Sequence, residues 1–164
     1  METLEDFWAV MNKVAPPSKM AASCNYHLFR EGIEPKWEDK ANEGGGKWVH
    51  GQPKQQPPRR DKLDKAWVAT ALAAVCEQLE LEGGGGAPQV CGVVMSARKN
   101  QDRLALWLAA GPSNEAAVMA IGSRWKQLLE LRGQGKIGFQ VHAEAISGGA
   151  GGGSSFSRSA KFVV

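Results

Sequence analysis

Two apolar segments near the middle of the chain, Val90–Ser96 and Arg103–Leu108, constrain the fold more than any other part of the sequence. They are separated by the short polar run ARKNQD, which is typical of the turn of a β-hairpin. Because side chains alternate along a strand, Arg103, Ala105 and Trp107 lie on one face of the second segment and three leucines on the other. The sequence therefore predicts an antiparallel hairpin with one leucine-rich face and one face that combines a cation with an indole.

Three segments have the spacing of amphipathic helices. In the first, apolar residues stand at positions 4, 7, 8 and 11 after an approximate capping box formed by Thr3 and Asp6. The second is expected to run from Asp61 or Asp64 to about Leu81, and the third to start at Ser113 or Asn114. Further strands are expected at residues 25–30, 47–50 and 137–141, with the terminal KFVV as another candidate. Elements in this order favour an α+β domain with helices on one face of an antiparallel sheet.

The composition limits the functional classes to which the chain can belong. With 164 residues, of which 43% are hydrophobic, one domain over residues 1–164 with a single core is expected. No apolar run approaches the roughly 20 residues of a membrane span. A net charge of +3 is too small for the broad basic face of a protein that binds duplex DNA. We therefore expect neither a membrane nor DNA as a partner.

The three cysteines and three histidines form no pattern that is typical of catalysis or metal binding. Cys24 and His27 stand three residues apart, but no second ligand pair and no CxxC accompany them. The glycine runs GGG and GGGG lack the spacing of a nucleotide-binding loop. We expect reduced thiols, no metal, no cofactor and no enzymatic activity. The N-terminus METLEDFWAV shows no signal or transit peptide, so the cytoplasm, with the nucleus as a further compartment, is expected.

An indole joined to two acids, in KWED at residues 36–39, stands in a segment that reads as a loop. Pro35 and the glycines at 44–46 interrupt the periodic apolar segment in which a core tryptophan normally lies. Trp37 is therefore expected to be displayed, either to receive a ligand or to cover a local apolar patch. A cationic guanine would stack on an indole, and a carboxylate such as Glu38 can accept hydrogen bonds from its N1–H and N2–H₂ edge. Lys47, Arg98 and Arg103 are candidates for the phosphates of such a nucleotide.

Six short motifs extend over almost the whole chain: DFWAV, GIEPKWED, GGKW, VCGVVMSAR, RLALW and the terminal FVV. Together they resemble eukaryotic translation initiation factor 4E, the family that binds the messenger-RNA cap, and KWED with NEAA is similar to its plant and green-algal members. The resemblance implies a curved antiparallel sheet with a concave cap-binding face and helices packed on the convex face. The resemblance implies a protein without enzymatic activity. It also implies two partners, capped mRNA and a scaffold initiation factor or 4E-binding peptide.

The resemblance also assigns roles to individual residues. It makes Trp37 a stacking ring and Glu38 the acceptor for the guanine edge, and it places Trp107 against the N7-methyl group. It assigns the phosphates to Lys47, Arg98 and Arg103. On the convex side it assigns a helical partner peptide to Leu4, Trp8, Val68, Ala69, Leu72 and Cys76. Trp48 and Trp67 are then expected to be core residues.

Two departures from the family pattern leave alternatives open. Family members begin with one or two strands and a loop that bears a second stacking tryptophan, and these are expected to be missing here because the chain starts shortly before DFW. The Gly/Ser-rich segment 147–159, expected to be a flexible loop, has no basic residue before Arg158. The principal hypothesis is a cap-binding protein that recruits a translation scaffold. The alternatives are a cap-impaired homologue that acts as a protein-interaction module, and a truncated form of an ordinary factor.

Overall fold

The computed structural model describes residues 3–54, 59–80, 88–131, 135–142 and 160–164. Its centre is an antiparallel sheet with the strand order β1-β3-β4-β2-β5-β6. The strands are β1 (Asn25–Phe29), β2 (Gly46–Pro53), β3 (Val90–Ala97), β4 (Gln101–Leu108), β5 (Gly138–Val141) and β6 (Phe162–Val163). The predicted α+β class is confirmed, and the C-terminal KFVV does return as a strand. The expected loop at 147–159 lies outside the described residues.

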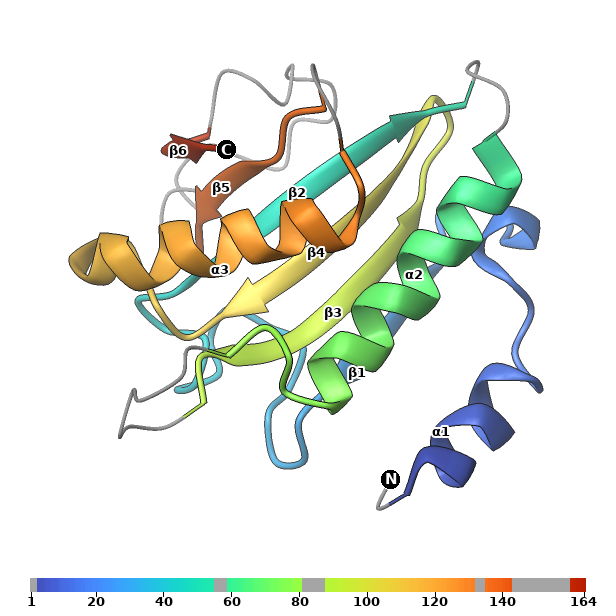
Figure 1. The fold of residues 1–164 in the computed structure, drawn as a ribbon, viewed down its shortest axis with the longest axis horizontal. Helices are drawn as coiled ribbons and strands as arrows, with labels where there is room; N and C mark the ends of the chain where they lie inside the picture. Colours follow the sequence, from blue (N-terminus) through green and yellow to red (C-terminus); the bar gives the residue numbers. More distant parts are fainter. Residues whose placement is uncertain (1–2, 55–58, 81–87, 132–134, 143–159) are drawn as a thin grey trace.

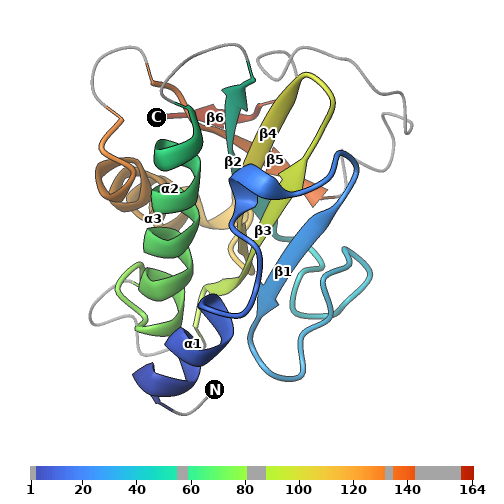
Figure 2. The ribbon, with the colours of Figure 1, turned by 90° about the vertical axis from the view of Figure 1, so that its right-hand side faces the viewer.

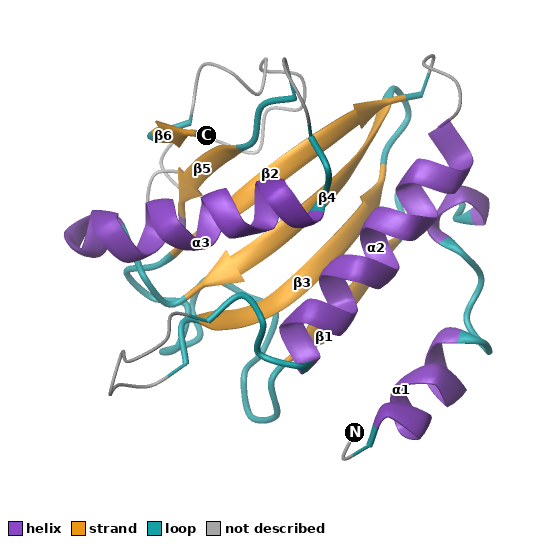
Figure 3. Cartoon of the chain, in the orientation of Figure 1, coloured by secondary structure: helices purple, strands orange, loops and turns teal. Residues whose placement is uncertain are grey.

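Helices cover one face of this curved sheet and leave the other face open (Figures 1 and 2). α2 (Arg59–Val75) and α3 (Glu115–Leu128) lie across the covered face, and α1 (Leu4–Met11) lies beside the C-terminal half of α2. Figure 3 shows the same division, with all three long helices on the viewer's side of the orange strands. None of the helices in the described part of the chain is long and apolar enough to cross a membrane.

The ends of α1 and α3 follow the predicted capping chemistry. The Thr3 hydroxyl accepts a hydrogen bond from the Asp6 backbone N–H, and the Asp6 carboxylate accepts one from the Thr3 N–H, both at 3.1 Å. The Asn114 side chain caps α3 by accepting from the Ala117 N–H. In both helices a side-chain oxygen thus satisfies a backbone donor that has no partner within the helix.

The boundaries of α2 differ from the prediction, because the helix starts at Arg59 and ends at Val75 rather than near Leu81. Glu77 adopts a positive φ of 56°, which breaks the helical backbone. The chain then turns back, and the Glu80 carboxylate accepts hydrogen bonds from the N–H groups of Gln89 (2.8 Å) and Val90 (2.9 Å). A long-range contact with the start of β3 therefore stabilises the turn where the apolar pattern alone suggests further helix.

The β3–β4 hairpin confirms the predicted alternation. Leu104, Leu106 and Leu108 are at most 1% exposed and belong to the main core beneath the helices. Ala105 and Trp107 belong instead to a smaller cluster on the open face, with Val49, Cys91 and Val94. Because β4 already begins at Gln101, the turn is shorter than the polar run ARKNQD suggests.

Tryptophans anchor the core between the sheet and α3. Trp48 is fully buried and donates from its indole N–H to the Val118 carbonyl at 3.0 Å, while Trp125 donates to the Thr70 hydroxyl at 3.0 Å. Trp67 is 4% exposed, so the expectation that Trp48 and Trp67 are core residues is confirmed. A Cβ added at Gly122 on α3 would overlap the Trp48 indole, which means that this close approach depends on glycine.

Gly122→Ala should therefore destabilise the protein, although alanine in a helix is normally more stable than glycine by about 1 kcal/mol. The extra methyl group would enter space that the Trp48 ring occupies, and overpacking of this kind costs about 1–3 kcal/mol. We expect a lower free energy of unfolding in urea denaturation followed by circular dichroism. Ser123→Ala, at the exposed neighbouring position, is the matched control and should be neutral or slightly stabilising. Equal stability of the two variants would contradict the packing argument.

Candidate ligand site on the open face of the sheet

The loop between β1 and β2, residues 30–45, is held in a defined shape by two polar side chains. The Asp39 carboxylate accepts hydrogen bonds from the N–H groups of Glu34 and Ala41, both at 2.9 Å, and these bonds lower the pKa of Asp39. Asn42 is fully buried, and its amide donates to the carbonyls of Glu34 (2.9 Å) and Lys36 (2.7 Å). One of the two acids beside the tryptophan thus has a structural role, which the sequence reasoning missed.

This loop displays Trp37 and Glu38 to solvent. Trp37 is 43% exposed and Glu38 is also exposed. Among the described residues, Trp37 belongs to neither apolar cluster, and the Glu38 side chain forms no hydrogen bond or salt bridge. The prediction that the ring is displayed is confirmed, whereas a role in covering a local apolar patch is not supported. Both side chains are positioned by a rigid loop and are available to a ligand.

The loop packs on the part of the open face that contains Trp107. Ile33 and Ala41 from the loop contact the cluster formed by Val49, Cys91, Val94, Ala105 and Trp107. Trp107 is only 7% exposed because Phe29 meets it edge-on, with 5.5 Å between ring centroids. Trp107 can therefore offer a ligand only a small part of its ring, which suits contact with a methyl group better than full stacking.

His142, just beyond β5, packs against Trp107 in a tilted arrangement, with 4.2 Å between ring centroids and an interplanar angle of 36°. It is 2% exposed, and its backbone N–H donates to the Gly45 carbonyl at 3.2 Å. Burial, together with the nearby Lys47 charge, lowers the pKa of His142 to about 4. The imidazole is therefore neutral at physiological pH. Sequence reasoning missed this contact, although the alternation along β5 places residues 138, 140 and 142 on the open face.

Two of the three candidate phosphate ligands, Lys47 and Arg103, lie on the open face in different environments. Lys47 pairs with Trp107 across the β2–β4 ladder, and its Nζ lies 5.4 Å from the centroid of that ring. Burial and the charge of Arg103 lower the pKa of Lys47. Arg103 is exposed, and the Gln101 side-chain oxygen, with the amide turned to satisfy both of its polar atoms, accepts from Arg103 Nε at 2.7 Å and from Nη2 at 3.0 Å.

Arg98 is directed toward the β1 edge of the sheet. Its guanidinium donates to the Asn25 side-chain oxygen and to the Ala97 carbonyl, both at 2.9 Å. Arg103 pairs with Ser96 across the hairpin, so both arginines lie near the same turn. Arg98 donates in addition to the Cys24 carbonyl at 3.4 Å, which makes three intramolecular hydrogen bonds, whereas Arg103 has the two to Gln101. Arg103 is therefore the arginine with more donors available to a ligand.

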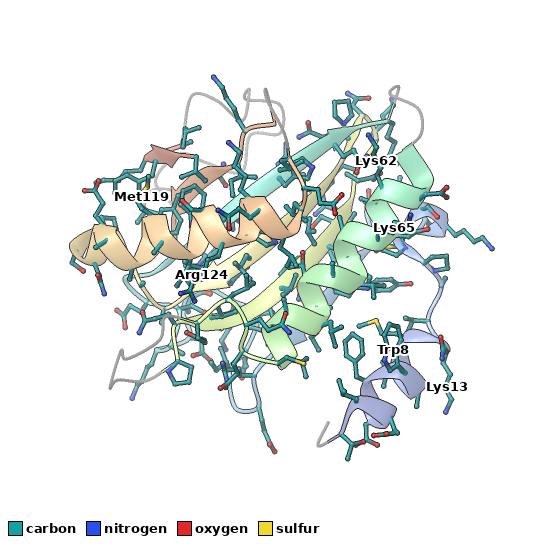
Figure 4. All side chains as sticks on the ribbon, viewed as in Figure 1. Trp8, Lys13, Lys62, Lys65, Met119 and Arg124 are labelled. Carbon is teal, nitrogen blue, oxygen red and sulfur yellow. The ribbon has the colours of Figure 1, made fainter. Side chains whose placement is uncertain are left out.

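The residues assigned to a partner peptide lie on the opposite, helix-covered side of the molecule. On α1, Leu4 is 51% and Trp8 42% exposed, whereas Phe7 between them is fully buried. Directly after α2, Cys76 is exposed, and Val68, Ala69 and Leu72 on the helix are half-buried. Figure 4 shows Trp8 on α1, in the view from the helix-covered side of the sheet. We call the set Leu4, Trp8, Val68, Ala69, Leu72 and Cys76 the α1–α2 surface.

The structure thus combines an antiparallel sheet, a displayed indole and cations on its open side, and an exposed apolar surface on the helices behind it, an arrangement typical of a binding domain. A family model described as "Eukaryotic initiation factor 4E" matches residues 1–155. The chain therefore belongs to the eukaryotic initiation factor 4E family.

Curated relatives agree with this assignment. The chain is 38% identical over 144 residues to eukaryotic translation initiation factor isoform 4E of Nicotiana tabacum, covering 88% of this chain and 65% of that protein. It is 36% identical over 147 residues to the human factor 4E type 1B, covering 90% of this chain and 58% of that protein. The chain thus spans less than two thirds of the length of these relatives.

Solved structures show the same fold. C. elegans eIF4E-3 in complex with the 4E-binding protein Mextli has a TM-score of 0.83 and 28% sequence identity, covering 100% of this chain and 83% of that one. Ascaris suum eIF4E-3 in complex with the m7G cap has a TM-score of 0.81 and 30% identity, covering 100% of this chain and 81% of that one. The predicted family and fold are confirmed.

The neutral state of His142 predicts a dependence of stability on pH. In the unfolded chain a histidine takes up a proton near its ordinary pKa of 6.5, whereas the folded pKa is about 4. Between these values the unfolded state binds more protons, so stability is lost as the pH falls. We expect this residue to reduce the free energy of unfolding by about 2 kcal/mol at about pH 5 relative to about pH 7.5.

Urea denaturation at the two pH values, with wild-type protein and His142→Phe, would measure this contribution. The variant should show a smaller loss of stability on acidification. His27→Gln at an exposed position is the control and should retain the wild-type pH dependence. An unchanged pH dependence in His142→Phe would contradict the neutral packing arrangement.

Proposed function

We propose that this chain binds the 7-methylguanosine cap of mRNA on the open face of the sheet and recruits a translation-initiation scaffold through the α1–α2 surface. The observation that carries the proposal is the exposed Trp37–Glu38 pair on a loop that Asp39 and Asn42 hold rigid. The similar Ascaris suum protein in complex with the m7G cap, and the C. elegans protein in complex with Mextli, support it. A role in initiation places the protein in the cytoplasm.

Recognition of the base combines two interactions on the same loop. A 7-methylated guanine carries a positive charge, which strengthens stacking on the electron-rich face of Trp37. Glu38 can accept hydrogen bonds from the N1–H and N2–H₂ groups, which lie side by side only on guanine. The small exposed part of Trp107 would contact the methyl group. The stack thus selects the charged, methylated base and the carboxylate selects guanine.

The cations would hold the phosphate chain that follows the base. Arg103 is exposed, and the guanidinium N–H groups that do not bind Gln101 can donate to phosphate oxygens. Lys47 is half-buried beside Trp107, so desolvation would strengthen its interaction with an anion. Arg98 would contribute its remaining donors while Asn25 fixes its position. Phosphate contacts of this kind give affinity and orientation, whereas the base contacts give specificity.

Glu38→Ala should weaken binding of 7-methyl-GTP by about 1–3 kcal/mol, because two donors of guanine would lose their acceptor. Quenching of tryptophan fluorescence during titration would measure the affinity. Glu43→Ala, an exposed acid of the same loop, is the matched control and should bind as wild type does. If the wild type binds and Glu38→Ala binds equally well, the assigned role of Glu38 is wrong. No detectable binding by the folded wild type would favour a protein-interaction module that does not bind cap.

Trp8→Ala should weaken binding of a scaffold-derived helical peptide by about 2 kcal/mol or more, since large aromatic anchors dominate such interfaces. The indole is 42% exposed, so its removal should leave the fold intact. Isothermal titration calorimetry with the peptide, and fluorescence titration with the cap analogue, would separate the two sites. Val14→Ala, an exposed apolar residue beyond α1, serves as the control. Retained peptide affinity in folded Trp8→Ala would refute the assignment.

A further inference from the structure

The apolar row of α2 continues into two lysines. Lys62, Lys65, Ala69, Leu72 and Cys76 are separated by three, four, three and four residues, so they lie in one row along the helix. Both lysines are exposed, and Figure 4 shows them on the same side of the molecule as Trp8. A segment lying along this row therefore meets apolar side chains over its length and two ammonium groups at the end nearest the start of α2.

These two ammonium groups have no carboxylate partner among the described residues. The Asp64 carboxylate, from the same turn, instead accepts hydrogen bonds from the Ser18 N–H (2.8 Å) and hydroxyl (2.7 Å). Asp61 stands one turn before Lys65 but forms no salt bridge with it or with Lys62 in the described part of the chain. The lysines are thus open to carboxylates supplied by another molecule.

The other end of the row carries the opposite charge. Glu5 is exposed in the first turn of α1, and Glu77 follows the end of α2 with a side chain that is 56% exposed and paired with Arg30 at 2.7 Å. α1 lies beside this end of α2 (Figures 1 and 2). Arg30 also pairs with Glu80 at 3.1 Å, so a single cation faces two carboxylates at this end. The α1–α2 surface is therefore polarised, with a basic end near Lys62 and a net acidic end near Glu77.

From this polarity we infer that the partner of the α1–α2 surface is an amphipathic helix with carboxylates at the end that lies over Lys62 and Lys65. The inference rests on the proposed function of this surface and adds the charge of its partner. Apolar anchors supply most of the affinity of a helix packed in this way. Charges at the end of the interface set its direction and reject segments with lysine or arginine at that end.

Four synthetic amphipathic peptides would test the direction and sign of this preference. They share apolar residues at i, i+4 and i+7 and carry either two glutamates or two lysines at either their N-terminal or their C-terminal end. At about 50 mM salt we expect wild-type protein to bind one of the glutamate peptides about three- to tenfold more tightly than the lysine peptide of the same orientation. The charge-reversed variant K62E/K65E should invert this preference. The control variant K40E/K99E replaces two exposed lysines elsewhere, so it changes the net charge by the same amount, and it should retain the wild-type peptide preference.

The possible results separate the charge inference from the proposed function. If all four peptides bind wild-type protein equally and Trp8→Ala weakens the binding of each, the charge inference is wrong and the partner surface stays in place. Absence of binding by any peptide to folded wild-type protein would overturn both. An unchanged peptide preference in K62E/K65E, with weaker binding of an uncapped RNA oligonucleotide, would overturn the inference in favour of an RNA contact. If K62E/K65E inverts the preference for the glutamate peptide and K40E/K99E does not, the partner carries carboxylates at this end.

Discussion

The alternation of side chains along β4 is the constraint on which both faces of the molecule depend. Even-numbered leucines enter the core beneath α2 and α3, while Arg103 and Trp107 reach the open face from the same strand. A slip of one residue in the pairing would exchange the two sets, burying a guanidinium and exposing the leucines. The burial of the leucines therefore fixes the register that places the cation and the indole on the open face. The placement of the candidate ligand groups on one side is a consequence of packing on the other.

Burial also lowers the pKa of the two basic groups beside Trp107. The imidazole of His142 and the ammonium of Lys47 are both more easily deprotonated than in water, because the apolar face penalises their charged forms. A neutral His142 adds an aromatic contact to Trp107 without adding a second cation near the proposed site of a positively charged base. Since a like charge there would repel such a ligand, the neutral state favours the proposed binding.

Periodicity and capping chemistry are local, and they predicted the elements that local sequence controls. The Thr3–Asp6 capping box, the Asn114 cap and the alternation in RLALWL each lie within one element, and the structure confirms them. The displayed position of Trp37 also followed from the absence of a periodic apolar context. Its roles in binding, like those of Glu38 and the cations, remain predictions.

Features that depend on contacts distant in sequence could not be read in this way. The end of α2 is set by the Glu80 carboxylate, which binds the N–H groups at the start of β3. The contact between His142 and Trp107 requires the pairing of β2 with both β4 and β5. The sequence does not show that the carboxylate of Asp39, next to Glu38, accepts hydrogen bonds from backbone donors of its own loop. The neighbouring carboxylates in KWED thus have different surroundings, because the three-dimensional loop determines which one accepts backbone hydrogen bonds and which one is exposed.

The two faces are separated by a densely packed layer, and this has a consequence for how they can influence each other. Leu106 and Val93, on neighbouring strands, are fully buried between the open face and the helices. Close-packed interiors do not deform continuously, so a signal between the faces requires an element with two discrete arrangements. Among the described residues, Arg30 at the start of the Trp37 loop forms ion pairs with Glu77 and Glu80 beyond α2. This ion-pair cluster therefore ties the loop that displays Trp37 to the turn that follows α2, beside the α1–α2 surface.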